Sequence, residues 1–238
     1  MSHSARKHLR VTIDSYDDAI RRFIPGYDTL LTEASAAAAA VSPAHALDLG
    51  AGTGGLSRAL LEHDGVGVVE LLDVDQEMLD HARERLTNHG DRVRFTLRSF
   101  EKPFPRCDAI VASLALHHIP TLDETRALYR RAFEALRSGG VLVNADCMMP
   151  RDSATRSSLY REWADHMVAH GITEARAWQH FEEWAEEDTY FSLEQEVEAV
   201  STAGFVATCV WQGGPMAVVV GARAGAGSTA GHPRGAAR

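Results

Sequence analysis

Length, composition and charge exclude several classes of protein. The chain has 238 residues, of which 45% are hydrophobic, so it can bury one substantial core and we expect one α/β domain with elaborations. A formal net charge of −9 gives no chain-wide attraction to nucleic acid phosphates, which disfavours a nucleic acid partner and favours a small molecule. Three widely spaced cysteines form no CxxC pair, so neither a disulfide framework nor a structural zinc site is expected.

Export and membrane attachment are not expected. The N-terminus lacks an apolar signal core, and the longest apolar run, near residues 34–41, is alanine-rich and too short to cross a bilayer. We therefore predict a cytoplasmic protein with no membrane partner. Formation of a homodimer is left as an open alternative. The excess of arginine over lysine, together with abundant alanine, suggests a bacterial source with a GC-rich genome.

The first elements in chain order are two helices. Residues 15–30 carry apolar and aromatic side chains at helical spacing, and Pro25-Gly26 interrupts the segment and restarts the chain. The alanine-rich residues 32–41 predict another helix. We group residues 1–42 as an N-terminal helical segment.

Strands and helices then alternate, which predicts a doubly wound, mostly parallel sheet with helical crossovers. The final two strands are joined through Gly213-Gly214-Pro215, a hairpin that makes the last strand antiparallel. The expected strands are 46–49, 66–72, 93–97, 109–112, 141–145, 205–211 and 216–221, and the expected crossover helices are 56–62, 77–88 and 122–136, the last stopped by Ser138-Gly139-Gly140.

A helical insertion interrupts this pattern between the fifth and sixth strands. Residues 151–188 lose strand-like runs and carry aromatic and histidine side chains at helical spacing. We predict a helical cap inserted into a domain that spans residues 43–222. Residues 223–238 are rich in Gly, Ala and Arg and are expected to be a disordered tail.

A glycine-rich loop follows the first predicted strand and precedes a helix. Its sequence is Asp48-Leu49-Gly50-Ala51-Gly52-Thr53-Gly54. Glycines at this position let the backbone approach a nucleotide-like ligand, and the helix N-terminus supplies N–H donors. The spacing fits both S-adenosylmethionine and a dinucleotide, so the loop alone does not choose between them.

A carboxylate ends the second predicted strand. Asp73 lies 23 residues after Gly50, where its oxygens can accept hydrogen bonds from both ribose hydroxyls of an adenosine group. The alternative is an acid on a solvated turn. A short-chain dehydrogenase would carry a Tyr followed four residues later by Lys, and that pair is absent from a chain with only two lysines, Lys7 and Lys102.

Four ordered segments together resemble the motifs of class I methyltransferases that use S-adenosylmethionine. They are ALDLGAGTGGLS, LLDVDQEML, CDAIVASLALHHIP and ALYRRAFEALRSGGVLVNAD, within a resemblance that covers about residues 16–222. The chain is most similar to the group that includes carboxy-S-adenosylmethionine synthases and small-molecule or tRNA-uridine methyltransferases. The resemblance implies a Rossmann-like sheet of order 3-2-1-4-5-7-6 and N-terminal helices that close over the cofactor.

The resemblance also assigns cofactor contacts. It places the loop near the methionine part, Asp73 at the ribose, Ser99 and Phe100 beside the adenine, and Ser113 on the methionine side with Tyr27 closing over it. The full set expected to contact S-adenosylmethionine is Tyr27, Asp48, Gly50, Ala51, Gly52, Gly54, Asp73, Val74, Ser99, Phe100 and Ser113.

Two departures from the group affect this assignment. Related enzymes usually have Asp where this chain has Ser99, and serine is the weaker hydrogen bond acceptor for the adenine amino group. Carboxy-S-adenosylmethionine synthases use an arginine before the last two strands to hold the extra carboxylate. Residues 193–203 contain no arginine, which favours ordinary S-adenosylmethionine.

Candidates for acceptor chemistry follow the fourth and fifth strands and lie in the cap. His117 can act as a base near the donated methyl group. His118 is interpreted as a packed structural residue, because two adjacent residues on a turn are not expected to face the same pocket. Asp146 either orients the acceptor or caps the next turn. The substrate candidates are Tyr16, His117, Asp146, Trp163 and His166.

No metal is predicted in this chain. His166 and His170 have the i, i+4 spacing of metal ligands, but the sequence offers no HExxH motif or evident third ligand beside them.

The leading hypothesis is methyl transfer from S-adenosylmethionine to O, N or C of a small-molecule acceptor, in bacterial secondary metabolism, with the cap selecting the acceptor. A tRNA-modifying methyltransferase is the alternative enzyme, although the acidic residues in 182–188 would repel RNA. A non-catalytic protein that binds S-adenosylmethionine is the other alternative.

Overall fold

The computed structural model describes residues 12–225. The tail that the sequence predicts to be disordered lies outside the described residues from position 226 onward. Within the described range, no helix is long and apolar enough to cross a bilayer.

A seven-stranded sheet organises the described residues, with strand order β3-β2-β1-β4-β5-β7-β6. Neighbouring strands from β3 to β5 pair in parallel, and β7 pairs antiparallel with both β5 and β6. This is the predicted sheet order, which is confirmed. The strands are β1 (His45–Leu49), β2 (Val68–Asp73), β3 (Val93–Leu97), β4 (Cys107–Ser113), β5 (Leu136–Cys147), β6 (Val206–Gly213) and β7 (Met216–Ala222).

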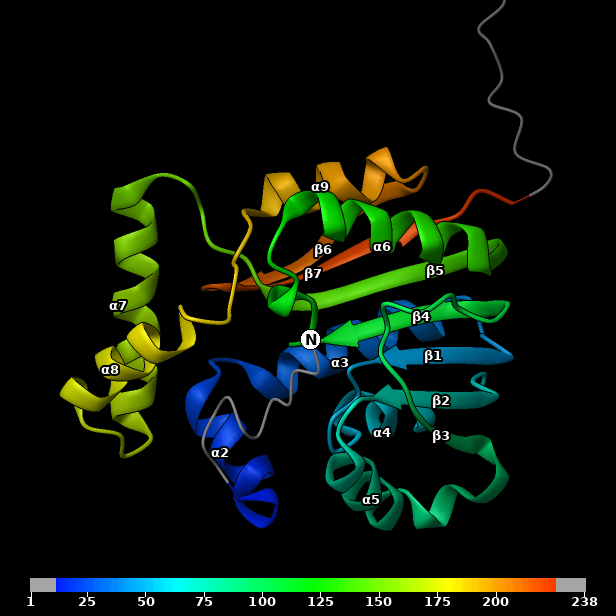
Figure 1. The fold of residues 1–238 in the computed structure, drawn as a ribbon, viewed down its shortest axis with the longest axis horizontal. Helices are drawn as coiled ribbons and strands as arrows, with labels where there is room; N and C mark the ends of the chain where they lie inside the picture. Colours follow the sequence, from blue (N-terminus) through cyan, green and yellow to red (C-terminus); the bar gives the residue numbers. More distant parts are fainter. Residues whose placement is uncertain (1–11, 226–238) are drawn as a thin grey trace, which may run out of the picture.

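Helices cover both faces of the sheet (Figure 1). One buried cluster joins one strand face to α3, α4 and α5, and a second joins the other face to α6 and α9. Period-two alternation of apolar side chains along the strands produces these two cores. The helices are η1 (Ile13–Ser15), α2 (Tyr16–Phe23), α3 (Tyr27–Ala39), α4 (Gly55–Leu61), α5 (Gln76–Arg85), η2 (Thr87–Arg92), η3 (Leu116–His118), α6 (Leu122–Ala135), α7 (Ser153–Ala169), α8 (Glu174–Trp184) and α9 (Leu193–Thr202).

Two predicted helix boundaries were wrong. The second helix begins at Tyr27 rather than residue 32, because Gly26 adopts a left-handed conformation with φ +66° that lets the chain restart at once. Helix α6 ends at Ala135 and β5 begins at Leu136. Leu136 already pairs with Cys107 of β4, so strand pairing ends the helix before the expected glycine stop.

Two helices, α7 and α8, fill the segment predicted as a helical cap, and Figure 1 shows them beyond the carboxyl ends of the central strands. Side chains of α7 join this cap to α2. The indole N–H of Trp163 donates to the Phe23 carbonyl at 2.6 Å, and Arg22 Nε donates to the His170 carbonyl at 3.0 Å. Helix α2 is therefore fixed against the cap at the edge where the strands end.

We predict that Trp163→Phe weakens this junction. The change keeps an aromatic ring but leaves the buried Phe23 carbonyl without its donor, so the free energy of unfolding should fall by about 1–3 kcal/mol. Urea denaturation followed by circular dichroism measures the loss. Trp178→Phe is the matched control, because Trp178 is only partly buried, and equal losses in the two variants would contradict the prediction.

Candidate cofactor and acceptor site

The loop between β1 and α4 presents bare backbone. Gly50 and Gly52 both have positive φ, +64° and +53°. A Cβ on Gly50 would lie 2.7 Å from Cβ of Ala115, whereas one on Gly52 would meet no atom within 4 Å. Gly50 is thus required by close packing, and Gly52 leaves its side of the loop open to a ligand.

Gly54 has a different environment from the one predicted. A Cβ there would lie 3.1–3.3 Å from side chains of Leu86, Leu71 and Ala82. Gly54 therefore faces the packing between β2 and α5, and it is absent from the walls of both parts of the cleft described below. Its contact with the cofactor stays a prediction, since loop spacing does not reveal which glycine faces the core.

Asp73 links the glycine loop to the end of β2. Its Oδ2 accepts a hydrogen bond from the Gly52 N–H at 2.8 Å, and its Oδ1 accepts one from the Asp75 N–H at 2.9 Å. Burial raises the pKa of Asp73, while these backbone donors act in the opposite direction. The carboxylate is thereby held in one orientation at the cleft.

The wider part of the cleft is a cavity of about 310 Å³. Predicted residues in its walls are Gly50, Asp73, Val74, Ser99 and Phe100. Residues that the sequence reasoning missed are Arg98, Glu101, Leu114, Ala115, His118, Ile119, Pro120, Glu124, Ala127, Leu128 and Arg131.

Ser99 lines the wider part of the cleft together with two glutamates. Its Oγ accepts a hydrogen bond from the Glu101 N–H at 3.1 Å, which occupies part of its acceptor capacity. Glu101 and Glu124 line the same cavity. Carboxylates are therefore present near Ser99 although the position itself carries none.

The narrower part of the cleft has about 40 Å³ and lies between the glycine loop and α2. Gly50 and Asp73 border both parts, so the two parts adjoin. The walls of the narrower part are Tyr16, Ile20, Tyr27, Asp48, Gly50, Ala51, Gly52, Thr53, Gly55, Leu56, Asp73, Ser113 and Leu114. All the predicted methionine-side residues except Gly54 are among them.

The acid and phenols of the narrower part are buried. Burial raises the pKa of Asp48 to about 7, and the Ser57 hydroxyl, which donates to Asp48 Oδ2 at 2.6 Å, acts against that rise. Burial raises the pKa of Tyr27 to about 12 and that of Tyr16 further. Both phenols therefore stay protonated at neutral pH and can donate hydrogen bonds.

A charged contact that the sequence reasoning missed holds α2 against the glycine loop. Asp17 of α2 accepts a hydrogen bond from the Thr53 hydroxyl at 2.7 Å and forms an ion pair with Arg85 of α5. Arg85 also donates to the Thr53 carbonyl at 3.1 Å. These contacts place Tyr16 and Ile20 over the cleft.

A second cavity, which we call the aromatic chamber, adjoins the cleft. It has about 40 Å³ and shares Tyr16, Ile20 and Leu114 with the narrower part and His118 with the wider part. Its walls are Tyr16, Ile20, Ile24, Leu114, His117, His118, Cys147, Trp163, Trp184, Asp188 and Tyr190. The predicted substrate residues Tyr16, His117 and Trp163 meet here.

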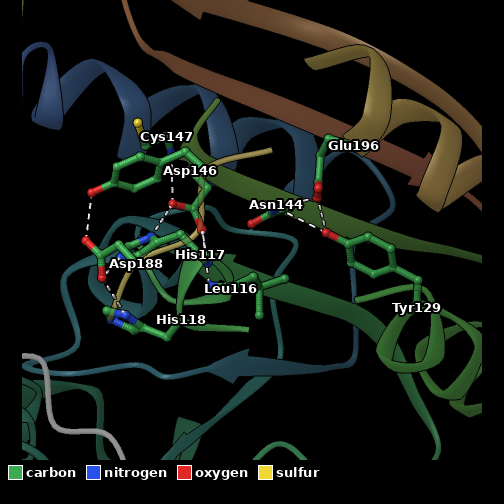
Figure 2. A network of polar contacts seen from close by, with 10 residues as sticks. Leu116, His117, His118, Tyr129, Asn144, Asp146, Cys147, Asp188 and Glu196 are labelled. Atoms are coloured by element: carbon green, nitrogen blue, oxygen red, sulfur yellow. Dashed lines mark hydrogen bonds and ion pairs between the residues drawn. The ribbon is translucent and has the colours of Figure 1, made fainter. Parts of the chain in front are cut away.

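His117 lies between two carboxylates, as Figure 2 shows. Its Nδ1 is 2.6 Å from Asp146 Oδ1, and its Nε2 is 3.8 Å from Asp188 Oδ1. The same Asp188 oxygen is 3.0 Å from His118 Nδ1, while the Tyr190 hydroxyl donates to Asp188 Oδ2 at 2.7 Å. Both histidines line the chamber, so the prediction that only one could face a pocket was wrong.

These carboxylates change the protonation of His117. Burial alone would lower the pKa of this imidazole, but the negative charges of Asp146 and Asp188 and the hydrogen bond with Asp146 outweigh burial and raise it to about 9. His117 therefore holds a proton at neutral pH in this arrangement.

Asp146 lies behind His117. Its Oδ2 accepts from the backbone N–H groups of Leu116 and His117 at 3.1 and 3.2 Å, and its Oδ1 also accepts from the Cys147 N–H at 2.8 Å. Asp146 is 2% exposed and is not part of the chamber wall. Its contact with the acceptor stays a prediction from the sequence, and in the structure Asp146 fixes the histidine turn.

His166 is also not part of the chamber. Its Nε2 is 3.1 Å from the Arg21 carbonyl on α2, and it lines none of the cavities described above. Its contact with the acceptor stays a prediction, since helical spacing does not say which neighbouring element these side chains face.

A three-residue cluster with metal-ligand chemistry was missed by the sequence reasoning. One ligand atom from each of His117, His118 and Asp188 lies within 4.8 Å of the others. His118 Nδ1 and Asp188 Oδ1 are 3.0 Å apart, which is within ion-pair distance.

Comparisons with known proteins agree with this geometry. A methyltransferase domain model matches residues 47–142. A methyltransferase of Bacillus pumilus is 30% identical over 151 residues, covering 61% of this chain and 68% of that protein. The carboxy-S-adenosyl-L-methionine synthase of Aeromonas salmonicida is 24% identical and covers 84% of this chain and 83% of that one.

Solved structures share the fold. An O-methyltransferase family protein from Burkholderia thailandensis superposes with a TM-score of 0.68 at 18% identity, over 94% of this chain and 61% of that one. The first solved structures found are about twice as long as the part this chain matches, at 50% and 49% coverage.

The chain belongs to the class I methyltransferases that depend on S-adenosylmethionine. Its cofactor is S-adenosylmethionine, and the open backbone at Gly52 beside the oriented Asp73 carboxylate fits a nucleoside with a flexible amino acid arm.

We predict that Asp73→Asn weakens binding of S-adenosylmethionine and S-adenosylhomocysteine about tenfold or more. The amide cannot accept charge-assisted hydrogen bonds from the ribose hydroxyls, and one such bond contributes about 1.5–3 kcal/mol. Isothermal titration calorimetry measures both affinities. Asp80→Asn, an exposed acid on α5, is the control, and an unchanged affinity in Asp73→Asn would show that the carboxylate does not hold the ribose.

Proposed function

We propose that this enzyme methylates a hydroxyl group of a small-molecule acceptor whose reacting end enters the aromatic chamber, with His117 as the general base. The observation that carries the proposal is the position of His117. Its ring lies in the wall of a chamber that adjoins the cofactor cleft, and Asp146 lies 2.6 Å from one of its nitrogens.

The walls of the chamber support a flat, largely apolar acceptor. Tyr16, Trp163, Trp184 and Tyr190 contribute aromatic surface. The polar wall groups are the two histidines, Asp188, Cys147 and the hydroxyls of the two tyrosines, of which Tyr190 donates to Asp188. A cavity of about 40 Å³ holds only a few water-sized groups. The chamber therefore admits the reacting end of an acceptor, and the rest would extend between α2 and the cap.

The hydrogen bond with Asp146 defines how His117 would act. When the ring is neutral and Nδ1 donates to Asp146, Nε2 carries the lone pair and points toward Asp188 and the chamber. Nε2 can then accept the proton of an acceptor hydroxyl, and the resulting imidazolium is stabilised by both carboxylates.

S-adenosylmethionine, when bound, supplies a methyl group on a sulfonium, whose carbon–sulfur bond breaks as the oxygen–carbon bond forms. The residues contribute by holding the acceptor oxygen close to that carbon and in line with the breaking bond, since positioning supplies much of the rate of such a displacement. Tyr16 and Leu114, which border both the chamber and the narrower cleft, are suited to exclude water from this junction.

Transfer to oxygen is favoured over transfer to an unprotonated amine because only a hydroxyl requires a base of this kind. The structurally similar protein from Burkholderia thailandensis is also an O-methyltransferase family protein. A role in bacterial secondary metabolism stays a prediction from the sequence, and so does the absence of a nucleic acid partner.

A turnover assay tests the proposal. The enzyme is incubated with S-adenosylmethionine and a panel of phenols, size-matched anilines and alkylamines, and unmodified tRNA, and release of S-adenosylhomocysteine is measured. We expect turnover with phenols. Turnover with tRNA alone would support the alternative enzyme class, and binding of the cofactor without turnover of any acceptor would favour a non-catalytic role.

The pH dependence of turnover follows from the pKa of His117. A base must lose its proton before it acts, and the pKa of about 9 places that loss above neutrality, so kcat/KM for a phenol should rise through about pH 9 and then level. His117→Ala should lower kcat by about 10²–10⁴-fold and abolish this limb.

The control for this variant is His170→Ala, which removes an exposed histidine at the end of α7. It should keep both the rate and the pH limb. A pH profile of His117→Ala that matches the unmodified enzyme would exclude His117 as the base.

A further inference from the structure

A second buried polar cluster lies behind His117, and Figure 2 shows it beside the histidine turn. Glu196 of α9 is 4% exposed. Its Oε1 accepts hydrogen bonds from the Tyr129 hydroxyl of α6 and from the Asn144 amide of β5, the latter at 2.7 Å. The Asn144 amide also donates to the Tyr129 oxygen at 3.2 Å. Glu196 is therefore a buried acid whose hydrogen bond partners here, Tyr129 and Asn144, carry no positive charge.

A small cavity of about 10 Å³ separates this cluster from the active site. Asn144 and Glu196 border it on one side and His117 and Asp146 on the other, and its remaining walls are Leu116, Thr125, Cys147, Met148, Thr189 and Phe191. Asn144 is 2% exposed, and within residues 12–225 its Oδ1 has no hydrogen bond partner. An acceptor that faces a cavity of this size indicates one bound water molecule.

We propose that this cavity binds one water molecule, and that Glu196 is a positioning residue whose buried charge, acting across the cavity, sets how tightly His117 holds its proton. The water would donate to Asn144 Oδ1 and to the Glu196 carboxylate. The catalytic consequence rests on the proposed function of His117 as base, whereas the charge coupling itself does not.

The coupling acts through space. Asp146 already accepts four hydrogen bonds, from three backbone N–H groups and His117 Nδ1, so its acceptor positions are filled. Charges separated by a dry interior interact more strongly than charges in water. An ionised Glu196 would therefore add to the negative potential that Asp146 and Asp188 already impose on His117.

Glu196 changes charge near neutral pH. Burial raises the pKa of Glu196 to about 7, against the hydrogen bonds from Tyr129 and Asn144, and the charge of Asp146 raises it further. The other ionisable side chains in the walls around His117 are His118, Tyr190, Cys147 and Asp188. Glu194 and Glu198 of the same helix are exposed, so solvent screens them.

Nuclear magnetic resonance of the imidazole nitrogens tests the coupling without an acceptor. Glu196→Gln keeps the size of the side chain and removes its charge, so the pKa of His117 should fall by about one pH unit. Glu198→Gln is the matched control, because it removes the same charge from the exposed face of α9, with a side chain 65% exposed. We expect no change in that control.

Equal pKa values of His117 in the unmodified protein and in Glu196→Gln would overturn the proposal. If Glu196→Gln does not fold, the unmodified protein decides the question. The ¹³C carboxyl resonance of Glu196 then gives the pH at which Glu196 titrates. The His117 ring signals must show a second inflection at that pH, and the absence of that inflection would also overturn the coupling. An ordered water within hydrogen bond distance of Asn144 Oδ1 in a high-resolution crystal structure is expected, and an empty cavity would exclude the bridge.

Turnover provides a separate readout. In Glu196→Gln the rising limb of kcat/KM for the phenol should move to lower pH by the same amount as the pKa of His117, while the plateau at high pH stays within about twofold, since no group that touches the acceptor is altered. A pKa shift seen by resonance without a shift of the limb would show that Glu196 controls His117 but that His117 is not the base. This outcome would contradict the proposed function and leave the coupling intact.

Discussion

The contact between Asp146 and His117 ties the end of β5 to the turn after β4, and the active site is arranged around it. Parallel strands end at one edge of the sheet, so the carboxylate and the imidazole meet there although 29 residues separate them. Asp146 also accepts backbone N–H groups from both sides of the contact. The fold thereby fixes one ring nitrogen of His117 and leaves the other to face the chamber.

The cofactor cleft and the aromatic chamber use different parts of the chain. The cleft is built from the carboxyl ends of β1 and β2 and the segments that follow β1, β2, β3 and β4, with α6 beside its wider part. Its acid Asp73 is oriented by backbone donors. The chamber needs α2, the cap and the segment after α8, which meet only through tertiary contacts such as that of Trp163 with Phe23. Binding of the methyl donor can therefore be common to the class while the acceptor is selected by elements outside the sheet.

The sequence predicted the sheet order and most of the narrower part of the cleft because those features follow short-range rules. Strand alternation, glycine spacing and an acid after the second strand each have a local signature, and four motifs in order fix their arrangement. Side-chain direction has no such signature, which is why Gly54, Asp146 and His166 were predicted as contacts although they are not in the walls of the cleft or the aromatic chamber. Asp188 and Tyr190 were missed because they lie in an irregular segment whose position depends on how the cap packs.

His117 illustrates how local sequence patterns and tertiary packing together determine the site. Its place after the fourth strand is readable from the sequence, but its proton affinity depends on Asp188 from the cap, Asp146 from the sheet and, we infer, Glu196 from α9. These acids are far apart in the chain and converge only in the folded molecule. Because each added negative charge tightens the hold of His117 on its proton, the packing of the cap and of α9 controls when the base is available, independently of the cofactor loop.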